Sequence, residues 1–164
     1  MKEQTVVKII LIAGVLLVGF LGSRLIGNLY YNKLIKLDKT IEQNNQNYKN
    51  QINQITDPTK AVRFGFIFFK NNQPEIAQIA FLKATELDPK WRDAWLFRGV
   101  AELKTANLNT ALDCLKKAEG LDPLYPLTYR YLAVAYAAIG DDESAKFAAD
   151  KMAYLEKTFP KKSD

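Results

Sequence analysis

Side chains suited to acid–base or metal chemistry are scarce in this sequence. It contains no histidine, the commonest general base near neutral pH, and only one cysteine, Cys114. A disulfide within the chain is therefore impossible, and a Cys/His metal site is excluded. Cys114 falls inside a predicted helix, where we expect a small buried apolar residue rather than a reactive thiol.

Motifs of catalytic or cofactor-binding sites are also missing. The chain has no glycine-rich phosphate loop, no cysteine pair and no paired carboxylates in a recognisable motif. Its acidic residues fall at positions expected on exposed helix faces and turns, where water solvates them. We therefore expect a protein that is not an enzyme, with no cofactor and no metal ion.

Positive charge is concentrated in the first part of the chain. Residues 1–60 hold eight Lys or Arg and four Asp or Glu, a net charge of +4, whereas residues 61–164 have a net charge of +1. The nearly neutral second part lacks a basic surface, which argues against a nucleic-acid partner. Positive charge beside an apolar segment favours contact with lipid headgroups instead.

An apolar segment at residues 6–26 is long enough to span a membrane. It would form about 31 Å of helix, close to the roughly 30 Å thickness of a hydrocarbon core. Its two charged residues, Lys8 and Arg24, lie near its ends. We expect residues 1–27 to be a single-pass anchor in the cell membrane. A cleaved signal peptide is the alternative, but no Ala-x-Ala site follows the apolar run.

Two features of the anchor leave alternatives open. The larger number of Lys and Arg after it favours a cytoplasmic position for the rest of the chain. A short basic N-terminus before an apolar run is typical of bacterial signal anchors, and it favours the extracytoplasmic side, which we prefer. Gly19, Ser23 and Gly27 recur every four residues, as on a dimer face, although chance gives such spacing as readily.

Residues 28–57 contain no glycine or proline and are expected to form a polar helical stalk. One seam of a coiled coil is indicated by apolar residues spaced by seven, Leu34, Ile41, Tyr48 and Ile55. The second seam becomes polar, since Leu37 is followed at the same spacing by Asn44 and Gln51. We therefore expect only weak self-association, in the form of a homodimer held by anchor and stalk. Asp57 and Pro58 break the helix and mark a domain boundary.

The remainder of the chain repeats itself with a 34-residue period. A Leu-Asp-Pro sequence ends at Pro89 and again, one period later, at Pro123. Small residues recur at the same step, in the sets Ala77, Ala111 and Ala145, and Gly65, Gly99 and Ala133. Such a period indicates stacked helical hairpins, in which small residues let two helices approach and proline ends the second helix.

This pattern resembles the tetratricopeptide repeat (TPR) family. The second unit matches it at Trp95, Gly99, Ala111, Leu115, Ala118 and Pro123. The first unit carries Gly65, Phe68, Ala77, Phe81, Ala84 and Pro89, and the third carries Tyr129, Leu132, Ala133, Tyr136 and Ala145. The third unit then departs from the pattern at Ala149, Met152 and Lys157, as a terminal capping repeat would.

The resemblance implies an all-α fold. In it, an N-terminal transmembrane helix and a helical stalk precede a three-repeat TPR α-solenoid over residues 58–158. The repeats would cover about residues 58–91, 92–125 and 126–158, and residues 159–164 would be a polar tail.

Helix boundaries follow from the same register. We expect helices near residues 58–70, 74–87, 91–104, 108–120, 125–138 and 142–157. Asn72 before Pro74 and Glu75 resembles a capping box, and Asp141 is expected to open the last helix. Arg98 and Glu102 replace apolar residues of the family pattern and, four apart on a helix, could pair.

In TPR proteins the first helices of the hairpins line a concave groove, which the resemblance places on eleven residues here. They are Val62, Phe66, Phe69, Lys70, Leu96, Val100, Leu103, Lys104, Leu127, Arg130 and Val134. The family's Lys and Asn clamp for an acidic peptide C-terminus is missing, because Val62 and Phe66 occupy its positions. An apolar or amphipathic segment with acidic flanks is the expected ligand. Packing of Phe66 and Phe69 against the chain's own stalk, or against each other, is the alternative.

These features predict a membrane-anchored TPR adaptor or scaffold that binds a protein or peptide partner. Its lipid contacts would be made by the N-terminal helix. Assembly or translocation of an envelope complex is the role that the fold suggests by analogy. The alternative is a structural accessory subunit, buried in a larger membrane complex, with no separable ligand.

Overall fold

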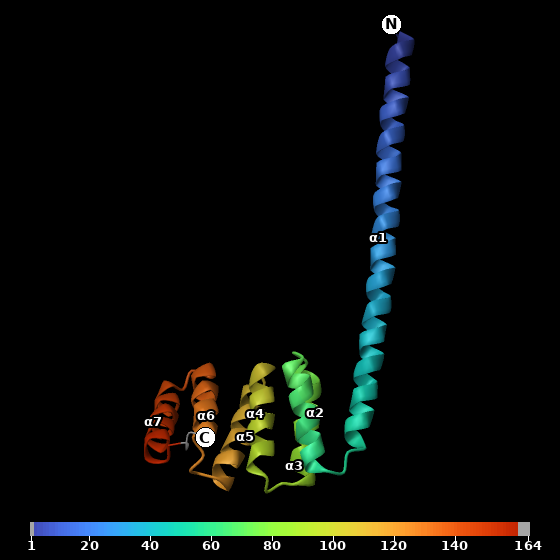
Figure 1. Ribbon diagram of the computed structural model, residues 1–164. Coiled ribbons are helices and arrows are strands. Elements are labelled where there is room, and N and C mark those ends of the chain that lie inside the picture. The colour runs from blue at the N-terminus through green and yellow to red at the C-terminus, as the bar shows by residue number, and fades with distance from the viewer. Residues whose placement is uncertain (1, 161–164) are drawn as a thin grey trace. The chain divides into compact units, whose positions relative to one another are not determined.

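The computed structural model describes the backbone of residues 2–160 and the side chains of Ser23, Ile26 and residues 28–160 (Figure 1). This part of the chain folds into seven α-helices, which confirms the all-α prediction. They are α1 (Lys2–Asn53), α2 (Pro58–Lys70), α3 (Pro74–Leu87), α4 (Arg92–Lys104), α5 (Leu108–Leu121), α6 (Pro126–Ala138) and α7 (Asp142–Thr158). The six predicted helices after the stalk each agree with these bounds to within one residue at either end.

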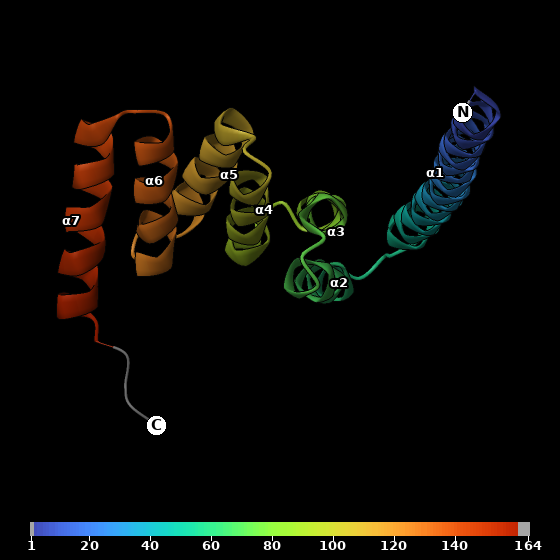
Figure 2. The ribbon, with the colours of Figure 1, turned by 90° about the horizontal axis from the view of Figure 1, so that it is seen from above.

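The chain divides into two compact units, residues 1–46 and residues 47–164. In the second unit, α2–α3, α4–α5 and α6–α7 form three hairpins that follow one another in chain order, as the two ribbon views show (Figure 2). Each hairpin also packs on the next, through α3 against α4 and through α5 against α6. This arrangement is a TPR-like solenoid.

Within the first two hairpins the helices approach at a glycine. A Cβ atom added to Gly65 of α2 would lie 2.5 Å from the ring of Phe81 in α3. At the equivalent contact of the second hairpin, a Cβ on Gly99 would lie 2.8 Å from Cγ of Leu115. Both distances are far below van der Waals contact, so only glycine allows the large residue opposite to fill the hairpin.

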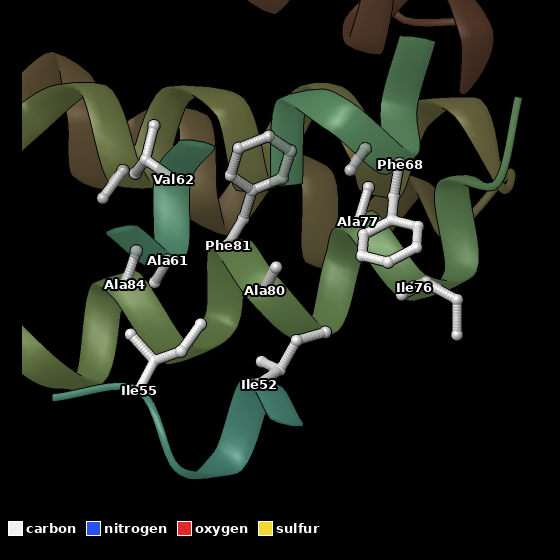
Figure 3. Close-up of a cluster of buried hydrophobic side chains, with 12 residues drawn as sticks. Ile52, Ile55, Ala61, Val62, Phe68, Ile76, Ala77, Ala80, Phe81 and Ala84 are labelled. Atoms are coloured by element: carbon white, nitrogen blue, oxygen red, sulfur yellow. The ribbon is translucent and has the colours of Figure 1, made fainter. Parts of the chain in front are cut away.

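The hydrophobic core consists of two clusters of buried side chains. The first joins Ala61 and Val62 of α2 to Ile76, Ala80 and Phe81 of α3 (Figure 3). The second joins the second and third hairpins through Leu96, Leu112, Leu115, Ala118, Tyr129, Leu132, Ala135, Ala148 and Leu155.

The end of α1 belongs to the unit of the hairpins. Ile52 is fully buried and Ile55 nearly so, and both lie in the first core cluster beside α3 (Figure 3). The ring of Tyr48 lies edge-on to that of Phe68, with 4.9 Å between their centroids. The predicted stalk runs to Asp57, whereas α1 ends at Asn53 and the compact unit begins at residue 47. The difference arises because these three apolar side chains cover the first hairpin.

The first helix of every hairpin ends in the same turn. Asn72, Ala106 and Gly140, which recur at the repeat period, have φ angles of 56°, 61° and 80°. At each turn two backbone N–H groups close back on the helix, for example Gln73 N to Phe68 O at 2.9 Å and Asn72 N to Phe69 O at 3.2 Å. This pattern of bonds is a Schellman motif.

These turns correct one predicted helix start. Asn72 does not cap α3, because its left-handed backbone is used to end α2; Gln73 holds the N-cap position without a side-chain bond. Asp141 does cap α7 as predicted, since its carboxylate accepts a bond from Ser144 N at 3.0 Å. Hydrogen bonds from Ser144 lower the pKa of Asp141, so this cap weakens as the carboxylate is protonated in acid.

An aromatic side chain of the next helix holds the loop at each repeated Leu-Asp-Pro sequence. The indole Nε1 of Trp95 donates to the carbonyl oxygen of Pro89, and the hydroxyl of Tyr129 donates to that of Pro123, both at 2.9 Å. Each aromatic residue thus attaches the first helix of its hairpin to the loop before it. Because both donors reach a proline carbonyl six residues earlier, two different aromatic side chains serve the same position.

No helix in the described part of the chain is long and apolar enough to cross a membrane. The predicted anchor at residues 6–26 falls on positions whose side chains, apart from Ser23 and Ile26, lie outside the described residues. The same holds for Gly19 and Gly27 of the predicted dimer face.

The glycine contact can be tested with alanine. Gly65→Ala should lower the free energy of unfolding by about 1–3 kcal/mol, because the new Cβ forces the packed ring of Phe81 to move. Gly120→Ala is the matched control: it also lies in a helix, no atom lies within 4 Å of its added Cβ, and it should stabilise by about 0.5–1 kcal/mol. Urea unfolding measures both. Equal effects of the two substitutions would contradict the close approach of α2 and α3.

Candidate protein-binding surfaces

The eleven residues of the predicted groove lie on α2, α4 and α6 but differ widely in exposure. Val62 and Leu96 are buried in the two core clusters. The remaining apolar members are half-buried, namely Phe66, Phe69, Val100, Leu103 and Leu127, except for Val134, which is exposed. The structure therefore leaves only part of the predicted set at the surface.

Phe66 packs against aromatic rings of the same unit. Its ring centroid lies 4.5 Å from that of Phe97 in α4 and 5.6 Å from that of Phe81 in α3, both edge-on. Phe66 therefore joins the first hairpin to the second. Phe69 is half-buried against the same cluster. Such contacts are typical of core packing. The ring partners of Phe66 are Phe81 and Phe97, however, and not the stalk or Phe69 as the self-packing alternative expected.

The basic members of the predicted groove are exposed. Lys70 and Lys104 each lie in the last turn of a first helix, α2 and α4. Arg130 lies on α6, where Nη2 is 3.5 Å from Oε1 of Glu156 in α7. Both partners of this pair are about half exposed, so its contribution to stability is small.

Arg98 and Glu102 form the predicted pair, but the carboxylate has closer partners. Arg98 Nε is 3.9 Å from Glu102 Oε1, too far for a hydrogen bond. The nearly buried carboxylate instead accepts bonds from Nε2 of Gln78 at 2.6 Å and from Nδ2 of Asn107 at 2.9 Å. Glu102 therefore connects α3, α4 and the start of α5, which is a structural role.

Cys114 is buried, as predicted for a small apolar side chain. Burial raises the pKa of its thiol to about 11, so the thiol is protonated and unreactive at neutral pH. No cluster of three or more His, Cys, Asp or Glu side chains that could hold a metal ion occurs in the part of the chain that the structure describes.

A pocket of about 390 Å³ lies between α5, α6 and α7, outside the predicted groove. Tyr129, Leu132 and Tyr136 of α6 and Phe147 and Ala148 of α7 supply its apolar walls, and its polar lining comes from Glu119, Glu143 and Ser144. Burial, followed by the nearby carboxylate of Glu119, raises the pKa of the Tyr129 hydroxyl. Among the described residues, the lining thus combines aromatic rings with two carboxylates and contains no basic side chain. The ammonium group of Lys116 contacts a lining ring, with Nζ 5.7 Å from the centroid of Tyr136.

Phe147 at the edge of this pocket is 69% exposed, and Tyr154, two turns further along α7, is 60% exposed. The equivalent residues of α5, one period earlier, are Asp113 and Gly120. An aromatic pair on α7 has therefore replaced an acidic residue and a glycine on the corresponding face. Alignment of the units at the 34-residue period reveals this difference. The family pattern does not, because it describes only the positions at which helices pack.

The packing of Phe66 gives a direct test of the predicted groove. Phe66→Ala should lower the free energy of unfolding by about 3 kcal/mol, because contacts with two aromatic rings are lost. Lys70→Ala, four residues further along α2 and exposed, is the control and should change stability by less than about 0.5 kcal/mol. Thermal unfolding of both variants provides the measurement. An unchanged midpoint of thermal unfolding for Phe66→Ala would show that this ring is not part of the core and is free to bind a ligand in the groove.

Comparisons with known proteins agree with the repeat register. Residues 62–90 match the family model of a tetratricopeptide repeat. No curated protein sequence matches the chain. Among solved structures, a crystal structure of MamA is 20% identical with a TM-score of 0.62, over 76% of this chain and 73% of that chain. A point mutant of MamA is also 20% identical, with a TM-score of 0.59, over 71% of this chain and 85% of that chain.

A chain of the CopN–Scc3 complex shares the fold as well, at 16% identity and a TM-score of 0.59, over 63% of this chain and 61% of that chain. Identities this low establish a common fold and nothing further. The family model thus matches one unit, at residues 62–90, and the solved structures share the fold of the hairpins.

Proposed function

We propose that this protein is a membrane-tethered adaptor whose last hairpin binds a segment of a partner protein. The observation that supports this function is the exposed ring of Phe147 beside the pocket between α5, α6 and α7. A large aromatic side chain exposed to water contributes little to the stability of a monomer, whereas aromatic residues next to pockets often dominate binding energy. The fold shared with a chain of a two-protein complex is consistent with this role.

The pocket favours a particular kind of segment. Its aromatic and leucine walls suit an apolar or aliphatic side chain, and Glu119 and Glu143 suit a basic group beside it. The predicted groove, with exposed Lys70, Lys104 and Arg130, would instead favour acidic flanks. Because the two surfaces prefer opposite charges, the charge of a bound segment identifies the surface that holds it.

The apolar segment at residues 6–26 is proposed to anchor the chain in the cell membrane. Its length matches the hydrocarbon core, and the basic residues on both sides of it suit lipid headgroups. We favour an extracytoplasmic position for the hairpins, where an adaptor could serve assembly or translocation in the cell envelope. Lys2 and Lys8, which precede or open the apolar run, would then lie on the cytoplasmic side.

The anchor predicts the behaviour of the full-length chain on fractionation. It should stay with membranes through high salt and alkaline carbonate, since both treatments remove proteins held by charge and leave a spanning helix in place. Its mass should be that of the uncleaved chain. Deletion of residues 1–27 is the control and should release the hairpins into the soluble fraction. Recovery of the full-length chain there, or a mature N-terminus near residue 24, would refute the anchor.

The second candidate is an accessory subunit that is held within a larger membrane complex and has no separable ligand. A fragment that folds without the anchor distinguishes the two functions. We choose residue 47 as its start, where the second compact unit begins, so that the fragment keeps Tyr48, Ile52 and Ile55 of the first core cluster. An adaptor fragment should retain a partner, whereas an accessory subunit should be recovered with partners only as the intact chain.

Phe147 provides the sharpest test of the adaptor. With residues 47–164 as bait, Phe147→Ala should reduce retention of the partner about tenfold or more, since an aromatic anchor at an interface often contributes about 2 kcal/mol. Ile67→Ala on α2, a residue also more than half exposed, is the control and should leave retention unchanged. Quantitative mass spectrometry of the retained proteins gives the readout, and circular dichroism checks the fold. Equal retention by all three baits would exclude Phe147 as the contact.

A further inference from the structure

Helix α1 exposes a regular apolar seam before it joins the hairpins. Tyr30, Leu34, Leu37 and Ile41 are 66%, 62%, 55% and 50% exposed. Their spacing of four, three and four residues is that of the a and d positions of a coiled coil, with Leu34 and Ile41 at a and Tyr30 and Leu37 at d. Exposed rings and aliphatic chains in such a row are costly unless another helix covers them.

The seam changes its surroundings at residue 47. Beyond Asn44, the a positions of the heptad fall on Tyr48 in α1 and on Ile55 just after its end, and both pack in the core of the hairpins. The d position between them, Gln51, is exposed. The boundary between the two compact units, residues 46 and 47, falls at this change. One part of the seam is thus covered by the chain itself, and residues 30–41 are the part that is not.

We propose that residues 30–41 of α1 pair with the same residues of a second copy of this chain, as a short parallel two-stranded coiled coil. The proposal rests on the membrane anchor of the proposed function, because anchors inserted in the same direction set two copies parallel. A heptad seam is self-complementary: side chains at a and d fit the spaces between equivalent side chains of another helix with the same spacing.

Charges beside the seam favour this partner and this direction. In the heptad defined by Leu34 and Leu37, Lys33 occupies position g of the preceding heptad and Asp38 occupies position e. In a parallel dimer these positions face each other across the seam, so the dimer contains two attractive pairs, one from each copy. Antiparallel helices pair g with g and e with e, and would lose both attractions.

The short length of the seam explains why the anchor matters. Fewer than two heptads give little stability to an isolated coiled coil, which usually needs three or more. Two chains tethered in the same bilayer have a high effective concentration, so a weak helix contact can form without a long seam. We therefore expect the anchored chain to dimerise, and the hairpins alone to remain monomeric.

Cysteine cross-linking of the full-length chain in its membrane tests the proposal. The native Cys114 is buried and unreactive, and Cys114→Ala removes it from every variant. Leu37→Cys and Tyr30→Cys, both at position d, should form a disulfide between copies on mild oxidation. Lys36→Cys and Lys39→Cys, at positions c and f on the outer face, are matched controls and should cross-link at least about tenfold more slowly, because their Cα atoms lie beyond disulfide range.

Charge reversal provides the second readout. In the Leu37→Cys background, Lys33→Glu should reduce cross-linking several-fold, and the double variant Lys33→Glu/Asp38→Lys should restore it, because the attraction between g and e is reformed.

Several outcomes would overturn the proposal. Equal rates at all four positions would indicate random collisions, and cross-links to a protein of different mass would indicate another subunit on the seam. Cross-links that form only between a Tyr30→Cys copy and an Ile41→Cys copy would indicate antiparallel helices. None of these results bears on partner retention through Phe147, which is measured on residues 47–164, so failure of the dimer and failure of the adaptor are distinguishable.

Discussion

The packing of the hairpins depends on how closely their two helices approach at one position. Gly65 faces Phe81 in the first hairpin and Gly99 faces Leu115 in the second, and in both cases an added Cβ would overlap the larger side chain. The equivalent positions of the third hairpin are Ala133 and Ala149. There the first residue has gained a methyl group and the second has lost most of its side chain, so the glycine is no longer required. The third unit's departure from the family pattern at Ala149 is thus matched by a compensating change, as expected of a close-packed interior.

Most of the fold could be predicted from the sequence because the helix boundaries are marked by proline and by the 34-residue register. Pro58, Pro74 and Pro126 each occupy the first position of a helix, where a missing N–H costs nothing. The end of the stalk could not be predicted in the same way. Tyr48 and Ile55 fit the heptad of a free coiled coil as well as they fit the core, and only the three-dimensional packing shows which contact they make.

The candidate site was harder to predict than the fold. Exposure depends on neighbouring units, so a position on a first helix can be buried, as Leu96 is, or exposed, as Val134 is. Glu102 shows the same limit, since its burial is tolerated only because Gln78 and Asn107, distant in sequence or on another element, donate hydrogen bonds to it. The left-handed backbone of Ala106 could not be predicted either, because alanine rarely adopts it and does so at a cost of roughly 1–2 kcal/mol. Asn72, one period earlier, is a residue that adopts this conformation more readily.

The two ends of the row of hairpins are supported unequally. At the start, α2 packs on α3, and the first hairpin is also covered by Tyr48 and Ile52 from the end of α1 and by Ile55 just after it. At the other end, α7 packs on α6, and no described helix follows it. In an array held by nearest-neighbour contacts, local opening begins where the fewest contacts must break. The amides of α7 should therefore exchange with solvent sooner than those of α3. Phe147 lies on this helix. A partner that binds there would therefore also stabilise the folded state of α7, so binding would be coupled to local folding.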